Sequence, residues 1–318
     1  MPTPLAVLYL FGGVIWLLMG GDLLIRGSIS LSQKAGVPPL VVGLTVVAFG
    51  TSAPELVVSL RAALTGYPDL SIANVVGSNI ANVLLVVGLP AIVYPMTCNQ
   101  PGARKDAAVM VGVSVLFFAL CTLGELGRPA GLALLAAFGL FLLYALQASM
   151  AEQSWEDESE EWERGLGLPR TSTMIATFLV LGTLALPLGA DLLVRGAVSL
   201  ADALGVASSV VGLTFVALGT SLPELATTLV AAFKREAALA VGNVIGSNMV
   251  NLLAIMGITA AVSPAPIPIP AGFLSLNLPL MVAAAATLAW AIHRRGVVGR
   301  RMGALLLASY LVFVVVLL

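Results

Sequence analysis

The chain has 318 residues, of which 59% are hydrophobic and only 10% are charged. Soluble domains carry roughly 25% charged residues, so this composition excludes an ordinary water-soluble fold and indicates a surface that faces lipid. A formal net charge of −1 gives no basic surface for nucleic acid, and two cysteines with one histidine exclude a disulfide framework and a zinc site.

Apolar runs of about 20 residues, separated by polar breaks, predict membrane-spanning helices along the whole chain. The first run lacks a basic leader, so we expect a retained span and not a signal peptide. The predicted spans are 4–31, 39–64, 70–95, 105–124, 129–149, 172–200, 208–233, 238–263, 270–292 and 302–318. We therefore predict an all-α membrane protein with ten transmembrane helices in two five-helix repeats, residues 1–150 and 171–318.

An acidic segment, residues 151–170, separates the two repeats. It carries seven carboxylates between Glu152 and Glu163. We interpret it as a solvated linker, with a regulatory cation site as the alternative.

The two halves are copies of one another. A constant shift of 169 residues aligns them without gaps from Asp22 and Asp191 to Pro95 and Pro264. "GLTVVAFGTSAPEL" matches "GLTFVALGTSLPEL" at 11 of 14 positions, and "NVVGSNIAN" matches "NVIGSNMVN" at 6 of 9. The matched residues are mostly polar, Gly or Pro, so apolar composition does not explain the repeat.

Five spans per copy is an odd number, so the second copy enters the membrane inverted. The charges of the loops agree, because eleven basic residues fall on one side and only Arg61 and Arg128 on the other. The eleven are Lys34, Arg104, Lys105, Arg164, Arg170, Lys234, Arg235, Arg294, Arg295, Arg300 and Arg301. The positive-inside rule then predicts that both termini are extracytoplasmic and that the linker is cytoplasmic. Inverted repeats are typical of secondary transporters, whose site lies at mid-membrane between the copies.

The string Gly-Thr-Ser-x-Pro-Glu occurs once in each copy, at Gly50–Glu55 and Gly219–Glu224. Proline removes an amide donor, so carbonyl groups near 48–51 and 217–220 are expected to be free, which lipid tolerates only around a cavity or a ligand. Hydroxyl, carbonyl and carboxylate oxygens form a set that suits hard cations such as Ca²⁺ or Na⁺. Buried glutamates without a basic partner must be balanced by protons or bound cations.

The second repeated string adds more oxygen ligands. Ser78 and Asn82 are four residues apart and share a helix face, as do Ser247 and Asn251. Four further amides could line the site or only join helices, and both interpretations stay open: Asn74, Asn79, Asn243 and Asn248. Asp22 with Arg26, and Asp191 with Arg195, are spaced for local ion pairs.

The paired "GTSxPE" and "GSN" strings resemble the repeats of the cation/Ca²⁺ exchanger superfamily, and specifically those of prokaryotic Na⁺/Ca²⁺ exchangers. The resemblance covers both halves and implies that Glu55 and Glu224 are shared by Ca²⁺ and Na⁺, with the Thr51 and Thr220 carbonyls at the Ca²⁺ site. It further implies flanking Na⁺ sites made by the hydroxyls of Ser52, Ser78, Ser221 and Ser247 and the carbonyls of Ala48 and Ala217. At the end of the second "GSN" string, where several relatives carry aspartate, this chain has Asn251, which matches Asn82 of the first string and resembles the K⁺-independent branch.

The resemblance implies an antiporter in which two long helices slide across a fixed core to alternate access. Its partners are Ca²⁺, Na⁺ and the lipid bilayer, in what we expect to be a prokaryotic plasma membrane. We expect no cofactor, no nucleic acid and no obligate protein partner.

Three alternatives stay open. A Ca²⁺/H⁺ antiporter of the same fold would use the glutamates as proton carriers, although that branch places an acid shortly after its "GN" and "GNVIGSN" has none. A membrane-embedded phosphate hydrolase would need a basic residue beside the glutamates, and none lies at that depth. A passive channel would conduct ions without a counter-ion.

Overall fold

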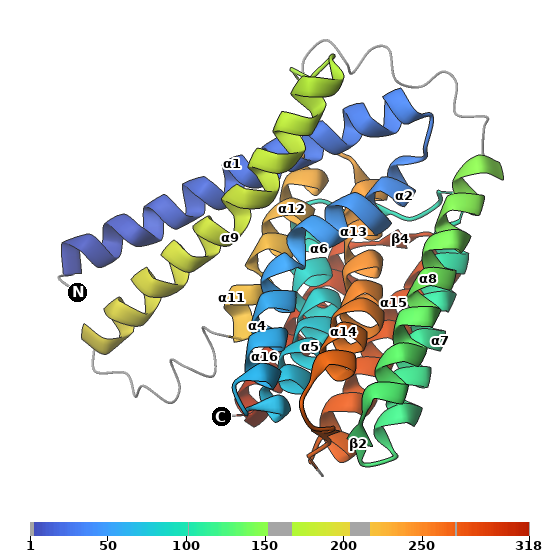
Figure 1. Ribbon diagram of the computed structural model, residues 1–318. Coiled ribbons are helices and arrows are strands. Elements are labelled where there is room, and N and C mark those ends of the chain that lie inside the picture. The colour runs from blue at the N-terminus through green and yellow to red at the C-terminus, as the bar shows by residue number, and fades with distance from the viewer. Residues whose placement is uncertain (1–2, 101, 152–166, 204–216, 271, 318) are drawn as a thin grey trace.

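The computed structural model describes residues 3–100, 102–151, 167–203, 217–270 and 272–317, and they are almost entirely helical (Figure 1). The first half contains the helices α1 (Thr3–Ala35), α2 (Pro39–Val42), η1 (Gly43–Val47), α3 (Ala48–Thr51), α4 (Ala53–Leu64), α5 (Pro68–Ala81), η2 (Asn82–Val87), α6 (Gly88–Val93), α7 (Ala103–Cys121) and α8 (Arg128–Ala151), where η marks a π-helical turn. Two short strands, β1 (Met96–Thr97) and β2 (Glu125–Leu126), flank α7.

Within the described residues, the second half follows a similar order from α9 to α16. Its helices are α9 (Ser172–Ala203), α11 (Ala217–Thr220), α12 (Leu222–Phe233), α13 (Ala237–Met249), η4 (Val250–Ile255), α14 (Met256–Val262), η5 (Phe273–Asn277), α15 (Leu278–Arg295) and α16 (Arg300–Leu317), with strands β3 (Ile267–Pro268) and β4 (Val297–Val298). The helices α4 and α12 begin and end at positions 169 residues apart, so the repeat found in the sequence is also a repeat of structure.

Helices lie on all ten predicted spans, within the residues that the structure describes. Six are long and apolar enough to cross a membrane alone, and the pair 39–51 and 53–64, bent by 48°, is a seventh if it counts as one span. Part of the predicted span 208–233 and most of the acidic linker, residues 152–166, lie outside the described residues.

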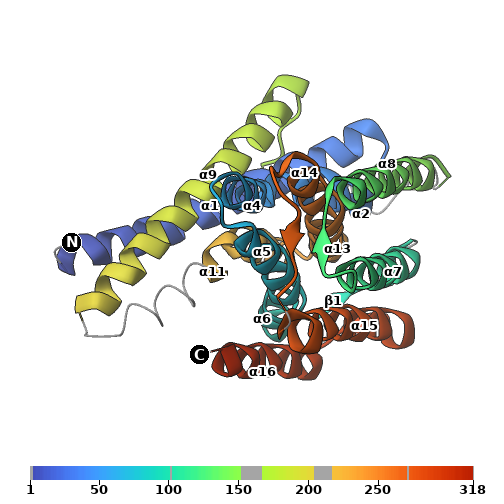
Figure 2. The ribbon, with the colours of Figure 1, turned by 60° about the horizontal axis from the view of Figure 1, so that its bottom comes forward.

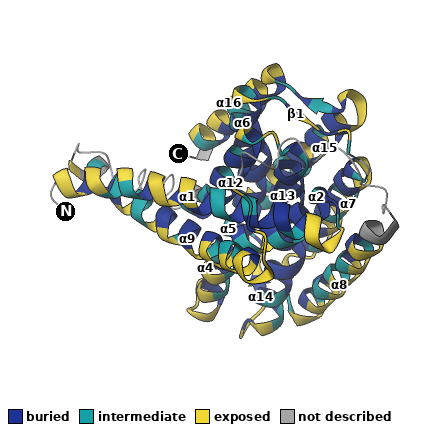
Figure 3. Cartoon of the chain, turned by 90° about the horizontal axis from the view of Figure 1, so that it is seen from above, coloured by how far each residue is buried: buried dark blue, intermediate teal, exposed yellow. Residues whose placement is uncertain are grey.

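Burial separates a core from a periphery. In the apolar 18-residue stretches of Pro68–Val93 and Ala237–Val262, 83% and 89% of the residues are buried, whereas in those of α1 and α9 the shares are 33% and 28%. Figure 3 shows exposed residues along α1 and α8 and buried ones along α13. Exposed side chains include Leu8, Phe11 and Val315, which are 64–70% accessible and would be costly in water. This outer surface therefore faces lipid.

The long helices α1 and α9 pack against each other in opposite directions (Figures 1 and 2). A Cβ atom on Gly13 would lie 2.8 Å from the Gly189 carbonyl oxygen, and one on Gly20 would lie 3.2 Å from that of Gly182. Glycine is needed at these crossings because the two backbones approach too closely for a side chain.

The loops of the two halves meet in pairs. Strand β1 pairs with β4, and β2 pairs with β3, both antiparallel. The connection after α6 therefore lies beside the one before α16, and the connection before α8 lies beside the one after α14.

Candidate functional site

A helix break precedes each buried glutamate. Helix α3 ends at Thr51, and Ser52 leaves the helical region with φ −84° and ψ 7° before α4 begins. Ser221 has φ −88° and ψ 1° before α12. Pro54 and Pro223 lie in the first turns of α4 and α12, where a missing amide hydrogen costs nothing. Glu55 and Glu224 thus lie in first turns, where the positive end of the helix dipole favours a carboxylate.

Both carboxylates are fully buried, at 0% exposure. Glu224 Oε1 accepts a hydrogen bond from Ser52 Oγ at 2.9 Å, so the first repeated string contacts the carboxylate of the second. Ser52 lies three residues before Glu55 in the chain, so this contact brings the two glutamate-bearing strings into one site. Glu55 Oε1, Glu55 Oε2 and Glu224 Oε2 have no hydrogen-bond donor among the described residues.

No lysine or arginine in the described part of the chain pairs with either glutamate. Arg26 pairs with Asp22, and Arg195 with Asp191, at 2.7 Å each, as their spacing predicted. Asp22 also pairs with Lys234, at the end of α12, at 2.8 Å, which the sequence did not indicate. A buried carboxylate is costly unless it is paired with positive charge, and the described residues supply none to either glutamate.

Hydroxyl groups surround the carboxylates in a mirrored pattern. Thr51 Oγ1 donates to Asn243 Oδ1 at 3.2 Å and lies 3.4 Å from Ser247 Oγ. In the other half Thr220 Oγ1 donates to Asn74 Oδ1 at 3.5 Å and lies 3.4 Å from Ser78 Oγ. Each threonine thus reaches the opposite half, and the two repeated strings of both copies form one site.

Asn74 and Asn243 have a structural role in this arrangement. Asn74 Nδ2 donates to the Glu55 carbonyl at 3.3 Å and to Ser59 Oγ at 2.9 Å. Asn243 Nδ2 makes the equivalent bonds, to the Glu224 carbonyl at 3.5 Å and to Thr228 Oγ1 at 3.0 Å. These amides hold each glutamate-bearing helix against its neighbour.

Further acceptors are buried without a donor. Asn82 and Asn251 are 0% exposed, and their Oδ1 atoms have no hydrogen-bond partner in the described part of the chain. Ser221 Oγ is also unpartnered. Buried polar atoms are rarely left unpaired, so this set of unpartnered oxygens is suited to binding a cation.

One expectation about the backbone is wrong. The Ala48 carbonyl is not free, because it accepts the Ser52 amide at 3.0 Å. The helix continues far enough for the Ser52 amide to reach it. The side chain of Ala217 lies outside what the structure describes, although its backbone belongs to α11.

The described residues contain no group of three or more His, Cys, Asp or Glu side chains that could hold a metal ion. The site offers two carboxylates among neutral oxygens, which suits hard cations and not zinc or copper. The sequence did not indicate Met110 and Met281, whose sulfur atoms accept bonds from Asn248 and Asn79.

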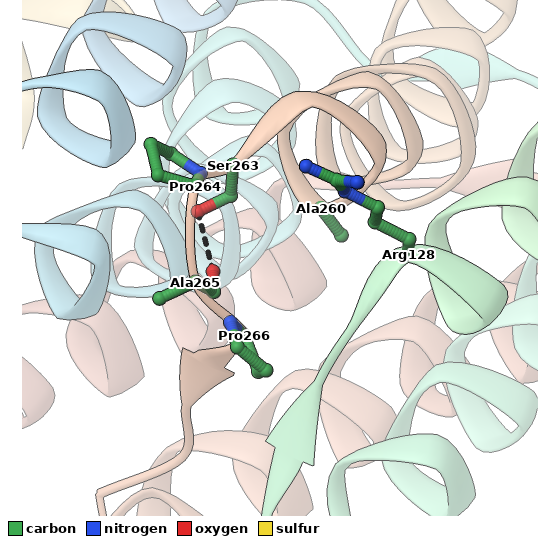
Figure 4. Close-up of a pocket in the computed structure, with 6 residues that line it drawn as sticks. All are labelled: Arg128, Ala260, Ser263, Pro264, Ala265 and Pro266. Carbon is green, nitrogen blue, oxygen red and sulfur yellow. Dashed lines mark hydrogen bonds between the residues drawn. The ribbon is translucent and has the colours of Figure 1, made fainter.

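A surface hollow lies away from these residues (Figure 4). Arg128, Ala260 and the segment 263–266 line it, and Ser263 Oγ donates to the Ala265 carbonyl at 2.6 Å. It is formed by the connections around β2 and β3, and none of the predicted ion ligands reaches it.

Comparison with known proteins identifies a family and a shared fold. The family model described as sodium/calcium exchanger protein matches residues 5–147 and 174–318. The chain is 34% identical to the inner membrane protein YrbG of Escherichia coli, covering 98% of this chain and 97% of that protein. It is 32% identical to the sodium/calcium exchanger MaX1 of Methanosarcina acetivorans, with coverage of 98% and 97%. A solved structure of the sodium-calcium exchanger NCX_Mj, soaked with zero Na⁺ and Ca²⁺, superimposes with a TM-score of 0.85 at 29% identity over 100% of both chains.

Proposed function

Because the chain belongs to the sodium/calcium exchanger family, and is therefore an integral membrane cation/Ca²⁺ antiporter, we propose that it exchanges Na⁺ for Ca²⁺ at the buried Glu55–Glu224 site. The observation that carries the proposal is the pair of fully buried carboxylates with three unpartnered oxygens and no basic partner among the described residues. One Ca²⁺ or two Na⁺ neutralise two carboxylates, and the two ions compete for the same oxygens. An empty, doubly charged site cannot cross a low-dielectric core cheaply, so movement of one ion requires the other.

The ligands divide by chemistry. Ca²⁺ is held by both glutamates and the carbonyls of Thr51 and Thr220. Na⁺ is held at flanking positions by hydroxyls and carbonyls: Ser52, Ser78, Ser221, Ser247, Ala48 and Ala217. At Ala48 the ion must share an oxygen that already accepts the Ser52 amide. Asn82 and Asn251 add neutral amide oxygens to this set.

The architecture proposed for this exchange is ten spans in two inverted repeats, 1–150 and 171–318, joined by the cytoplasmic linker 151–170, with both termini extracytoplasmic. Contacts between the basic loops support it. The Arg235 guanidinium lies 5.7 Å from the centre of the Tyr94 ring, Lys34 Nζ donates to Ser172 Oγ, and β1 pairs with β4. These contacts join loops that carry described members of the basic set, which supports a shared cytoplasmic side.

The movement proposed for alternating access is a displacement of α1 and α9 relative to the buried core. Their glycine-lined crossing and their low burial support it, because small residues leave no interlocking side chains at the crossing.

Coupling to Na⁺ and not to H⁺ is the finer part of the proposal. The amides Asn82 and Asn251 stay neutral at every pH, and the donor set contains hydroxyls that suit Na⁺. In proteoliposomes, radiolabelled Ca²⁺ uptake should require an opposing Na⁺ gradient and persist when the pH gradient is collapsed. Uptake driven by a pH gradient without Na⁺ would replace Na⁺ by H⁺ as the coupling ion, and uptake without any counter-ion would indicate a channel.

A further inference from the structure

Four asparagines and two methionines form two matched chains of hydrogen bonds at the centre of the molecule. Asn82 Nδ2 donates to Asn248 Oδ1 at 3.2 Å, and Asn248 Nδ2 donates to Met110 Sδ at 3.5 Å. In the mirrored chain, Asn251 Nδ2 donates to Asn79 Oδ1 at 3.3 Å, and Asn79 Nδ2 donates to Met281 Sδ at 3.9 Å. Each chain crosses twice between the two halves.

The methionines lie on helices that contribute no predicted ion ligand. Met110 belongs to α7 and Met281 to α15, and these two helices pack against each other on the side of α5 and α13 away from α1 and α9 (Figure 2). All six side chains are at most 2% exposed, so water cannot replace a missing partner.

A thioether sets the direction of each chain because it has lone pairs and no hydrogen to donate. Facing Met110, Asn248 must present its NH₂ group and turn its oxygen to Asn82. Asn82 must then present its own NH₂ group to Asn248. The oxygen of Asn82 is then turned away from Asn248, and Asn82 Oδ1 is buried without a donor. The same reasoning from Met281 through Asn79 leaves Asn251 Oδ1 unpartnered, as observed.

We propose that Met110 and Met281 are positioning residues, which act through Asn248 and Asn79 to turn the amide oxygens of Asn82 and Asn251 toward the bound cations. The inference rests on the proposed function, since it concerns how the same site accepts cations. An asparagine amide without such a constraint can rotate by half a turn and present NH₂ groups, which repel a cation. The two sulfur atoms therefore keep amide oxygens, and not NH₂ groups, facing the cations, without adding a titratable group to the site.

The test is equilibrium binding of Ca²⁺ and of Na⁺ to the purified full chain in detergent. Met110→Leu and Met281→Leu keep an apolar side chain of similar volume and remove the acceptor. Met256→Leu is the matched control, since Met256 is also 0% exposed and the structure gives no hydrogen bond to its sulfur within the described residues. Loss of one hydrogen bond predicts a Kd increase of about 3- to 10-fold. The effect should be larger for Met110, whose contact is the shorter.

A double-mutant cycle separates positioning from packing. In an Asn248→Leu background the chain of hydrogen bonds from Met110 to Asn82 is already broken, so adding Met110→Leu should change the Kd for either ion by less than about 2-fold. A purely structural role would instead lower the melting temperature of the ion-free protein and leave the ion affinities unchanged.

The proposal is overturned if Met110→Leu and Met256→Leu give the same Kd, or if Met110→Leu acts equally with and without Asn248. Failure of the proposed function is distinguishable, because the unmodified chain would then bind neither Ca²⁺ nor Na⁺ competitively, whatever the methionine variants do.

Discussion

Replacing Glu55 by glutamine tests the charge balance of the site. Glu55 is fully buried, both of its oxygens lack donors among the described residues, and the nearby carboxylate is Glu224. The change keeps the shape and lowers the charge of the empty site from two negative charges to one. A bound Ca²⁺ then leaves one uncompensated positive charge, which costs about 3–5 kcal/mol when buried.

That cost corresponds to a loss of roughly 10²- to 10³-fold or more in Ca²⁺ affinity, and transport should fall below detection. The same change should leave the ion-free protein at least as stable, because it removes repulsion between two buried carboxylates. Two measurements therefore move in opposite directions: Ca²⁺ uptake into proteoliposomes disappears, and the melting temperature without ions is unchanged or higher.

The matched control is Glu125→Gln, which makes the same chemical change at an exposed position in β2. It should leave uptake and melting temperature unaltered. Uptake by Glu55→Gln within about 3-fold of the unmodified chain would refute the reasoning, because the Ca²⁺ binding energy would then not have fallen by the cost of an unpaired buried charge.

Three further predictions follow from individual contacts. Ser52→Ala removes the 2.9 Å hydrogen bond to Glu224 and should weaken Ca²⁺ binding about 10-fold, by the value of one bond to a charged group; an unchanged Kd in a titration would contradict its place in the site. Asn251→Asp adds a titratable group where an amide oxygen is unpartnered, so the rate of Ca²⁺ uptake should become more dependent on pH, and a profile unchanged from that of the unmodified chain would count against it. Lys234→Gln breaks the 2.8 Å pair with Asp22 and should reduce the free energy of unfolding by about 1 kcal/mol without altering the Ca²⁺ Kd; a large change in Kd would tie this pair to ion binding.

Much of the fold could be predicted because the membrane limits which backbone structures an apolar segment can adopt. Helices lie on the predicted segments wherever the structure describes them, since apolar runs in lipid must satisfy their backbone internally. The repeat identified the equivalent positions, and Pro54 and Pro223 located the helix breaks. What local pattern could not provide is the fine course of the backbone: the Ala48 carbonyl was expected to be free and instead caps the turn at Ser52.

Contacts between distant segments were the least predictable part of the site. Asn74 and Asn79 lie five residues apart in one string, yet Asn74 braces the Glu55 carbonyl and Asn79 joins a chain that ends at Met281. Met110 resembles any other apolar residue of its span until the fold places it beside Asn248. Lys234 meets Asp22 for the same reason, since more than two hundred residues separate them in sequence.

The central claim is that two mirrored carboxylates share a bound cation and have no basic partner in the protein. Crystals of the full chain soaked with Sr²⁺, a heavier substitute for Ca²⁺, test it most directly through anomalous scattering. The account predicts one strong peak with oxygens of both Glu55 and Glu224 at about 2.3–2.6 Å or slightly more, the distance of Ca²⁺ ligands. A peak that contacts only one glutamate, or a lysine or arginine between the two carboxylates, would contradict it.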